Sequence, residues 1–241
     1  MATPDLPSQV LAAAPQAAVR EALDGSGQLS ARASFVGDVA HGPMQVFGAS
    51  GKPAMEANYQ AGLPQGPMRL FDERGQLLQE THRLGGLADG ITRTYYPSGK
   101  LMQTQQHVRG LLHGEAVAYA ESGDATARLP YAAGRLDGDA IYLNEGRVVR
   151  RERYRVGLLD GETLDHTPQG GVAQSSTYRA NVLHGPLRRY WPNGQLMEEV
   201  AYRNGKPHGN PRRFDEAGRE IVATTSPPGF MKSLEKFVKG G

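Results

Sequence analysis

Four histidines that each precede a glycine are the side chains best suited to chemistry in this sequence: His41, His113, His184 and His208. Imidazole is a common zinc ligand and a proton-transfer group near neutral pH. A shared zinc site requires each ligating nitrogen to lie about 2 Å from the metal. The first question is therefore whether the elements that carry these histidines can bring them together.

Carboxylate pairs are the other candidates for chemistry. Asp160 with Glu162, and Glu198 with Glu199, stand in polar sequence that is typical of a solvated surface. No Gly-x-Ser-x-Gly, P-loop or dinucleotide-binding fingerprint lies between an expected strand and helix. We therefore expect no catalytic residue, no cofactor and no bound metal, and a chain that is not an enzyme.

A repeat of about 24 residues organises the chain. An aromatic residue or histidine opens each unit, and a glycine follows seven or eight residues later. The opening residues are Phe35, Tyr59, His82, His107, Tyr131, Tyr154, Tyr178 and Tyr202. A second glycine and a second aromatic recur at fixed distances from the first glycine. This spacing predicts eight tandem structural units.

Turn residues and short strand-like runs fill each unit. Gly62, Gly86, Gly110 and Asn181 share one repeat position and tolerate positive φ. Sequences such as Pro97-Ser98-Gly99 mark a second turn. Two turns and two strands of about five residues fill 24 positions, which predicts β-hairpins. A lone hairpin is barely stable in water, so the units must stack.

This stacking decides the interpretation of the histidines. The His-Gly pairs occupy one repeat position, which also takes Gln65, Asp89, Asp137 and Asp160. Equivalent positions in stacked hairpins are two strands apart, about 10 Å. That separation is too large for a shared zinc ion. The pattern favours polar turn residues that precede an obligatory glycine.

At this point the sequence resembles a known family. The stretches Tyr178–Gly185, Tyr190–Gly194 and Tyr202–Gly209 look like MORN repeats, and more closely like the variant MORN repeats of bacterial antitoxin and immunity proteins. The resemblance covers Phe35 to Ile221. Leu143 and His166 depart from it, because they replace expected aromatics. It implies an all-β, elongated, single-layer stack of antiparallel hairpins, a MORN-like solenoid with short helical ends.

The ends differ from the repeats. Residues 1–34 are expected to form an N-terminal helical cap, because Leu6 to Leu23 is rich in alanine, with Pro15 breaking the helix. Residues 35–221 form the repeat array. Residues 222–241 form a tail in which Met231, Leu234, Phe237 and Val238 stand at helical spacing, beside Lys232, Lys236 and Lys239. Terminal caps would shield the outermost strands of the array.

Arginine and aromatic residues recur along the expected strands. Arg69, Arg93, Arg188 and Arg212 each stand two residues before an aromatic, so both side chains point to one face. Such residues are enriched at binding hot spots. The alternative is packing within the repeat, with the arginine stem covering the ring. The candidate partner-binding residues are Arg69, Arg93, Tyr96, Arg188, Tyr190, Trp191, Arg212 and Phe214. A basic run from Arg147 to Arg155 is a further candidate, or a charged strand edge that prevents aggregation.

The composition narrows the possible classes of partner and the possible compartment. The net charge of +2, from 27 basic and 25 acidic residues, argues against nucleic acid. The chain has no cysteine and no apolar run long enough to span a membrane. The N-terminus does not look like a signal peptide, so we expect a cytoplasmic protein, or a periplasmic one if the chain is a trimmed mature form.

Two functions follow as expectations. The resemblance implies an immunity protein or antitoxin that binds and occludes a cognate toxin, such as a phospholipase-type effector of type VI secretion. The alternative is a membrane-surface or protein-assembly scaffold module, because MORN repeats are associated with membranes and the C-terminal segment is basic and amphipathic. A short amphipathic helix alone gives only weak membrane affinity.

Overall fold

The computed structural model describes residues 17–221 and shows β-strands joined by turns, with no helix among them. The chain divides into two compact units, residues 1–137 (unit 1) and residues 138–241 (unit 2). Each unit is a stack of antiparallel hairpins, which confirms the predicted all-β, MORN-like repeat fold.

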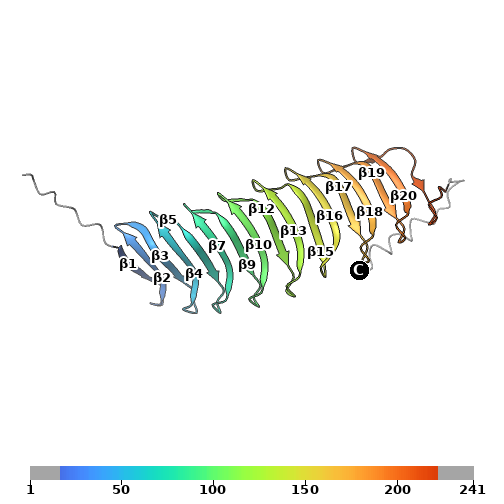
Figure 1. Cartoon of the computed structure of the whole chain (residues 1–241). Helices are drawn as coiled ribbons and strands as arrows, with labels where there is room; N and C mark the ends of the chain where they lie inside the picture. The colour runs from blue at the N-terminus through green and yellow to red at the C-terminus, as the bar shows by residue number, and fades with distance from the viewer. Residues whose placement is uncertain (1–16, 222–241) are drawn as a thin grey trace, which may run out of the picture. The chain divides into compact units, whose positions relative to one another are not determined.

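Unit 1 contains fourteen strands among its described residues, 17–137. The longer ones are β1 (Ala17–Leu23), β2 (Leu29–Val36), β3 (Val39–Phe47), β4 (Pro53–Gln60), β6 (Gly66–Phe71), β7 (Leu77–Leu84), β9 (Gly90–Tyr95), β10 (Leu101–Val108), β12 (Gly114–Tyr119) and β13 (Ala125–Ala132). The two-residue ones are β5 (Leu63–Pro64), β8 (Leu87–Ala88), β11 (Leu111–Leu112) and β14 (Arg135–Leu136). Figure 1 shows the longer strands side by side in chain order.

Unit 2 contains eight described strands. They are β15 (Gly138–Asn144), β16 (Arg147–Arg155), β17 (Leu158–His166), β18 (Val172–Arg179), β19 (Val182–Tyr190), β20 (Leu196–Arg203), β21 (Lys206–Pro207) and β22 (Arg212–Arg213). Consecutive strands from β15 to β20 pair antiparallel (Figure 1). The last strand, β22, has only two residues and pairs with β20.

Two kinds of turn connect the strands. The first is a two-residue turn with positive φ at both positions, as at Ala61-Gly62 and Asn204-Gly205. That geometry matches the right-handed twist of the flanking strands. The second is longer and ends on a positive-φ glycine such as Gly99 or Gly194. Both confirm the turns predicted from sequence.

The repeat that runs from Tyr131 to Tyr154 is 23 residues long, one fewer than most, and one turn explains the difference. Asn144 pairs directly with Arg147, so Glu145-Gly146 forms a two-residue turn where other repeats use a longer one. The missing residue therefore leaves the strand register intact.

The interior is made of small side chains. The buried hydrophobic residues among residues 17–221 are Ala33, Ala57, Ala116, Val117 and Ala140. Buried threonines and serines occupy the centres of other strands, including Thr81, Thr92, Thr163, Ser175 and Ser176. Larger side chains flank them and stay half-buried. Stability therefore depends on strand pairing and on contact between neighbouring repeats rather than on one thick core.

The structure corrects the expectation for the N-terminus. Ala17–Leu23, placed in a broken helix from its alanine content, is strand β1, paired with β2 from Ala17↔Val36 to Leu23↔Leu29. Strand β2 also lies within the expected cap of residues 1–34. Backbone pairing to an open sheet edge outweighs the helix propensity of alanine. Residues 6–16 of the expected helix, and the expected C-terminal helix, lie outside the described residues.

One repeat anchor was also misplaced. Arg83, not His82, faces Ala88 as Tyr59 faces Pro64 and His107 faces Leu112. The repeat is thus 24 residues on both sides of Arg83, and an arginine takes the aromatic position. Because adjacent residues of a strand point to opposite faces, the one-residue difference places His82 on the other face.

Candidate partner-binding surfaces

Charged side chains of unit 1 lie opposite one another along one face. Strand register aligns Glu21, Arg32, Gln45, Glu56, Arg69, Glu80 and Arg93, which we call the unit 1 charge row. Arg69 Nε lies 3.0 Å from one oxygen of Glu80, and Arg93 Nη1 lies 3.7 Å from the other. The predicted arginines Arg69 and Arg93 are therefore brought together by a shared carboxylate.

A similar arrangement stands in unit 2. Arg188 Nε lies 2.6 Å from Glu199, and Arg212 Nη1 lies 3.8 Å from the same carboxylate. Arg212 also donates two hydrogen bonds of 2.9 Å to Glu220, which lower the pKa of Glu220 and raise the pKa of Arg212. The Arg212 guanidinium lies 5.2 Å from the centre of the Phe214 ring. Arg212 and Phe214 therefore pack on each other within the repeat, which is the alternative to partner binding that the sequence analysis described.

Two predicted aromatic residues bind the following repeat. The Tyr96 hydroxyl donates to the carbonyl oxygen of Tyr119 at 2.7 Å, and Trp191 Nε1 donates to the carbonyl oxygen of Phe214 at 3.0 Å. Both rings, like that of Tyr190, remain partly exposed. These side chains therefore lock neighbouring repeats together and still present ring surface to a partner.

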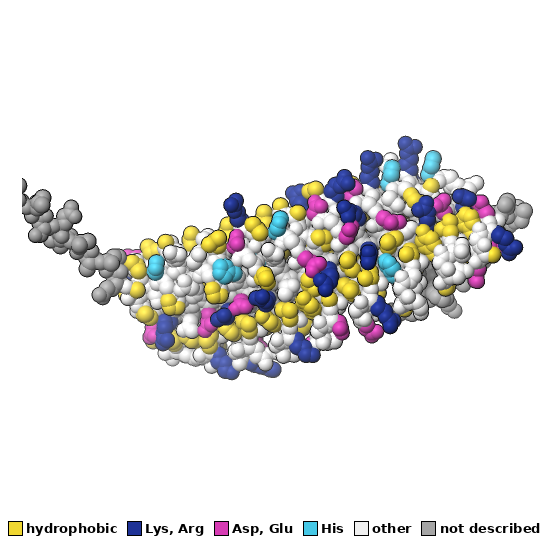
Figure 2. Space-filling view, viewed as in Figure 1, with side chains coloured by type: hydrophobic (Ala, Val, Ile, Leu, Met, Phe, Trp, Pro, Cys, Tyr) yellow, Lys and Arg dark blue, Asp and Glu magenta, His cyan; other side chains and the backbone are white. Residues whose placement is uncertain are grey.

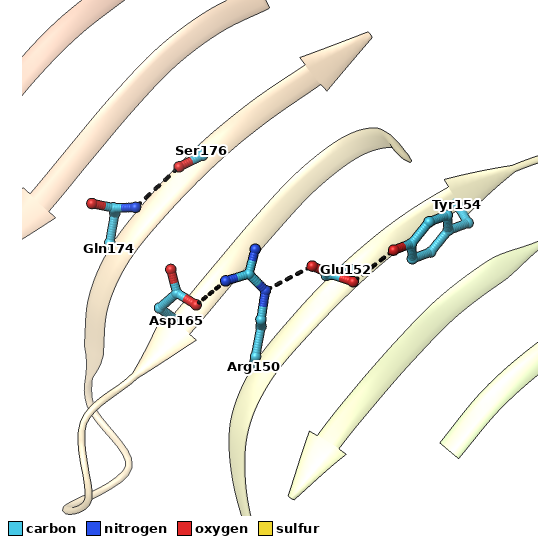
Figure 3. A network of polar contacts seen from close by, with 6 residues as sticks. All are labelled: Arg150, Glu152, Tyr154, Asp165, Gln174 and Ser176. Atoms are coloured by element: carbon cyan, nitrogen blue, oxygen red, sulfur yellow. Dashed lines mark hydrogen bonds and ion pairs between the residues drawn. The ribbon is translucent and has the colours of Figure 1, made fainter. Parts of the chain in front are cut away.

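A polar network lies on the opposite face of unit 2 (Figure 3). Glu152, whose side chain is only 10% exposed, accepts hydrogen bonds from Arg150 Nε at 2.7 Å and from the Tyr154 hydroxyl at 2.8 Å. Arg150 also reaches Asp165 at 3.1 Å. Burial and the neighbouring Glu152 raise the pKa of Tyr154 far above its ordinary value, so this phenol stays a donor. The network is satisfied internally and stabilises the stack.

The basic run from Arg147 to Arg155 does not form one patch. Arg150 belongs to the Glu152 network, whereas Arg151 lies opposite Ile141 and Leu164 on the other face. Arg153 forms an ion pair with Asp139 at 2.8 Å. Strand alternation therefore distributes these charges over two faces.

The residues before the repeat glycines bind the next turn. The side chains of Gln65, Asp89, Asp160 and His184 each accept a hydrogen bond from a backbone N–H about twenty residues ahead. His184 Nδ1 accepts from Asn204 at 3.4 Å. Histidine, glutamine and aspartate each supply an acceptor side chain for this bond. Residues 17–221 contain no cluster of three or more possible metal ligands.

Two unusual residues occupy the aromatic position of neighbouring repeats in unit 1. His107 Nδ1 lies 3.3 Å from the Thr92 hydroxyl, which in turn lies 2.7 Å from the Thr81 hydroxyl. Burial, and then the positive charge of Arg83, lower the pKa of His107. Arg83 Nε is buried and has no hydrogen-bond partner within the described chain. An arginine and a histidine thus stand where other repeats have Phe or Tyr, and leaving Arg83 Nε buried without a partner is unfavourable.

Exposed aliphatic side chains flank the two-residue turns of unit 1. Val39, Leu63, Leu84, Leu87, Val108 and Leu111 are between 43% and 53% exposed, and we call them the aliphatic ridge. Leu84 pairs across the turn with Leu87, and Val108 with Leu111. Figure 2 shows hydrophobic side chains along the upper edge of unit 1. The ridge was not predicted from the sequence, although its main members recur every 24 residues.

Unit 2 places charged residues at four of the six corresponding repeat positions and exposed Leu158 and Val182 at the other two. Arg155 faces Leu158, Arg179 faces Val182, and Arg203 faces Lys206. Figure 2 shows Lys and Arg side chains projecting from the upper edge of unit 2. The same turn geometry therefore carries an apolar edge in unit 1 and an edge of alternating basic and aliphatic side chains in unit 2.

An apolar groove, the terminal groove, lies at the end of the described part of unit 2. Its volume is about 380 Å³. Its apolar lining includes Leu187, Trp191, Met197, Val200, Tyr202, Phe214 and Ile221. The predicted residues Trp191 and Phe214 thus meet there, whereas Arg69, Arg93 and Tyr96 belong to unit 1.

Comparisons with known proteins identify part of the array. A family model described as the MORN repeat variant matches residues 88–108 and 183–204, so the chain contains MORN repeat variants at these two places. No curated protein matches the chain. Among solved structures, a mutant of S. aureus TarM crystallised with Fondaparinux, alpha-GlcNAc-glycerol and UDP is similar over 50% of this chain and 20% of that chain, with 10% identity and a TM-score of 0.27.

Proposed function

We propose that the chain is a non-catalytic binding protein that recognises another protein through the aliphatic ridge of unit 1. The observation that carries this proposal is a line of exposed valine and leucine side chains. In unit 2 the corresponding line is interrupted by arginine and lysine, although Leu158 and Val182 remain exposed there. Contiguous exposed apolar surface on a water-soluble molecule marks an interaction site. Flanking hydrogen-bonded turns hold the ridge rigidly, which lowers the entropy lost on binding.

The partner that we propose is a toxin, in keeping with the resemblance of the repeats to those of bacterial immunity proteins. The specific expectation is a phospholipase-type effector of type VI secretion encoded beside this gene. The hairpin stack would cover the toxin's active site and exclude its substrate. No residue of the chain takes part in a chemical step in this mechanism.

Inhibition of that effector tests the proposal. The purified chain is titrated against the product of the neighbouring toxin gene, and phospholipase turnover is measured. Turnover should vanish near a one-to-one ratio. Full activity in the presence of a large excess of the chain would exclude the toxin-inhibitor function.

A matched pair of variants locates the binding surface. Leu87→Asp in unit 1 should weaken inhibition at least tenfold, because a charge is buried at the interface. Leu158→Asp stands at the same repeat position in unit 2 and should leave inhibition unchanged. Thermal unfolding of both variants controls for folding. Equal effects of the two substitutions would place the contact elsewhere, and Arg69→Ala with Arg93→Ala then tests the charge row.

Membrane-surface binding is the second candidate function, favoured by the same exposed ridge. Residues 17–221 contain no helix that is long and apolar enough to cross a membrane, so this candidate concerns peripheral contact. Aliphatic side chains can enter the boundary between headgroups and acyl chains. Flotation with anionic phosphatidylserine vesicles separates the candidates: recovery with the vesicles that is lost in Leu87→Asp supports membrane binding, and absence from the vesicle fraction rules it out.

A further inference from the structure

The terminal groove is an apolar surface at the end of a repeat stack. Interior strands of unit 2 are covered by eight- or nine-residue neighbours such as β18 and β19, whereas β22 has two residues. Its pairing with β20 is limited to Glu198↔Arg213 and Glu199↔Arg212. The side chains of the last full repeat therefore lack the covering that the next repeat supplies elsewhere.

The charged groups that line the groove are paired with one another, because two arginines share one glutamate. Glu198 accepts a hydrogen bond from Arg189 Nη1 at 2.9 Å and lies 3.1 Å from Arg213 Nε. Trp191 Nε1 is bonded to the backbone of Phe214. What remains for an occupant is mainly apolar surface, in a volume of about 380 Å³ that falls in the range of ligand pockets, roughly 300–1,000 Å³.

The chain itself leads into this groove. Ile221, the last described residue, lines it and donates its backbone N–H to the carbonyl oxygen of Arg213 at 2.8 Å. Twenty residues follow Ile221 in the sequence. The segment from Met231 to Val238 begins ten residues further on. Ten residues of extended chain can span up to about 35 Å.

The composition of that segment complements the groove. Met231, Leu234, Phe237 and Val238 recur at a spacing that gathers apolar side chains on one side of a helix, and Lys232, Glu235 and Lys236 fall on the other. We propose that residues 231–238 bind in the terminal groove of unit 2 and cap the array intramolecularly. This assignment is independent of the partner proposed above.

The sequence supplies a direct probe, because Trp191 is the only tryptophan and lines the groove. The full-length chain is compared with the full-length double variant Leu234→Asp/Phe237→Asp. The variant should show red-shifted Trp191 emission and stronger quenching by acrylamide, since the groove is opened to water. The control Lys232→Ala/Lys236→Ala, on the polar side, should match the parent chain.

The proximity of residues 231–238 to Trp191 is measured in a separate experiment. The chain has no cysteine, so Ser233→Cys can carry a single acceptor dye for tryptophan emission. Efficient energy transfer from Trp191 that is independent of protein concentration, and that falls in the Leu234→Asp/Phe237→Asp background, is the expected result. Transfer that appears only at high concentration would indicate a second copy of the chain and overturn the proposal. Identical emission, quenching and transfer in all variants would also overturn it.

Discussion

At the residue scale, the most informative side chain is a glutamate that the sequence does not distinguish from its neighbours. Glu80 is shared by Arg69 and Arg93, and Glu199 is shared by Arg188 and Arg212. Each carboxylate lies between two guanidinium groups whose strands flank its own, and it offsets their repulsion. The arginines that looked like binding residues thus also hold neighbouring repeats together.

Replacing the shared carboxylate tests this role. Glu80→Gln should lower the free energy of unfolding by about 1 kcal/mol, the upper range for partly exposed pairs, because both arginines then lose the negative charge between them. The loss should shrink at high salt. Denaturant unfolding at low and high ionic strength is the measurement.

The control is an ion pair in open solvent. Asp38 pairs with Arg20, but its side chain is 96% exposed. Asp38→Asn should therefore leave the unfolding midpoint unchanged. If both substitutions had the same effect, the charge row would have no structural importance.

At the element scale, the hairpins depend on glycines at two kinds of position. Gly185 combines φ of 121° with close packing, since an added Cβ would lie 2.9 Å from Thr177 Cβ. Gly194 also has positive φ, 85°, but no atom lies within 4 Å of an added Cβ. The first glycine is required by conformation and space, the second by conformation alone.

Alanine substitutions separate these two requirements. Gly185→Ala should cost about 3 kcal/mol, because backbone strain and the contact with Thr177 add. Gly194→Ala should cost about 1 kcal/mol, the usual price of a left-handed alanine. Thermal or denaturant unfolding compares the two variants. Equal losses would show that strand β18 moves aside without cost.

At the scale of the whole molecule, the small interior sets the response to denaturant. The buried hydrophobic side chains among residues 17–221 are four alanines and one valine. The slope of unfolding free energy against denaturant concentration follows the surface exposed on unfolding. We expect a guanidinium slope clearly below that of a compact β-protein of similar length. A slope equal to that of such a protein would contradict the thin interior described above.

The two edges also belong to this scale. Repeats in both units share one turn geometry, yet Leu84 and Val108 in unit 1 correspond to arginines in unit 2. The backbone repeats while the edge chemistry changes, which is how one fold presents different surfaces to different partners. Under the proposed function, we expect binding specificity to depend on the edges of the hairpins rather than on the fold.

The sequence by itself determined the hairpins and the turns, because glycine spacing and strand alternation are local signals. Only the tertiary structure decided that Arg83 replaces an aromatic, that Glu80 joins two arginines, and that Ala17–Leu23 pairs as a strand. It also placed Ile221 against Trp191 and Phe214 in one groove. The physical reason is that cross-strand contacts depend on register, and a shift of one residue turns a side chain to the opposite face.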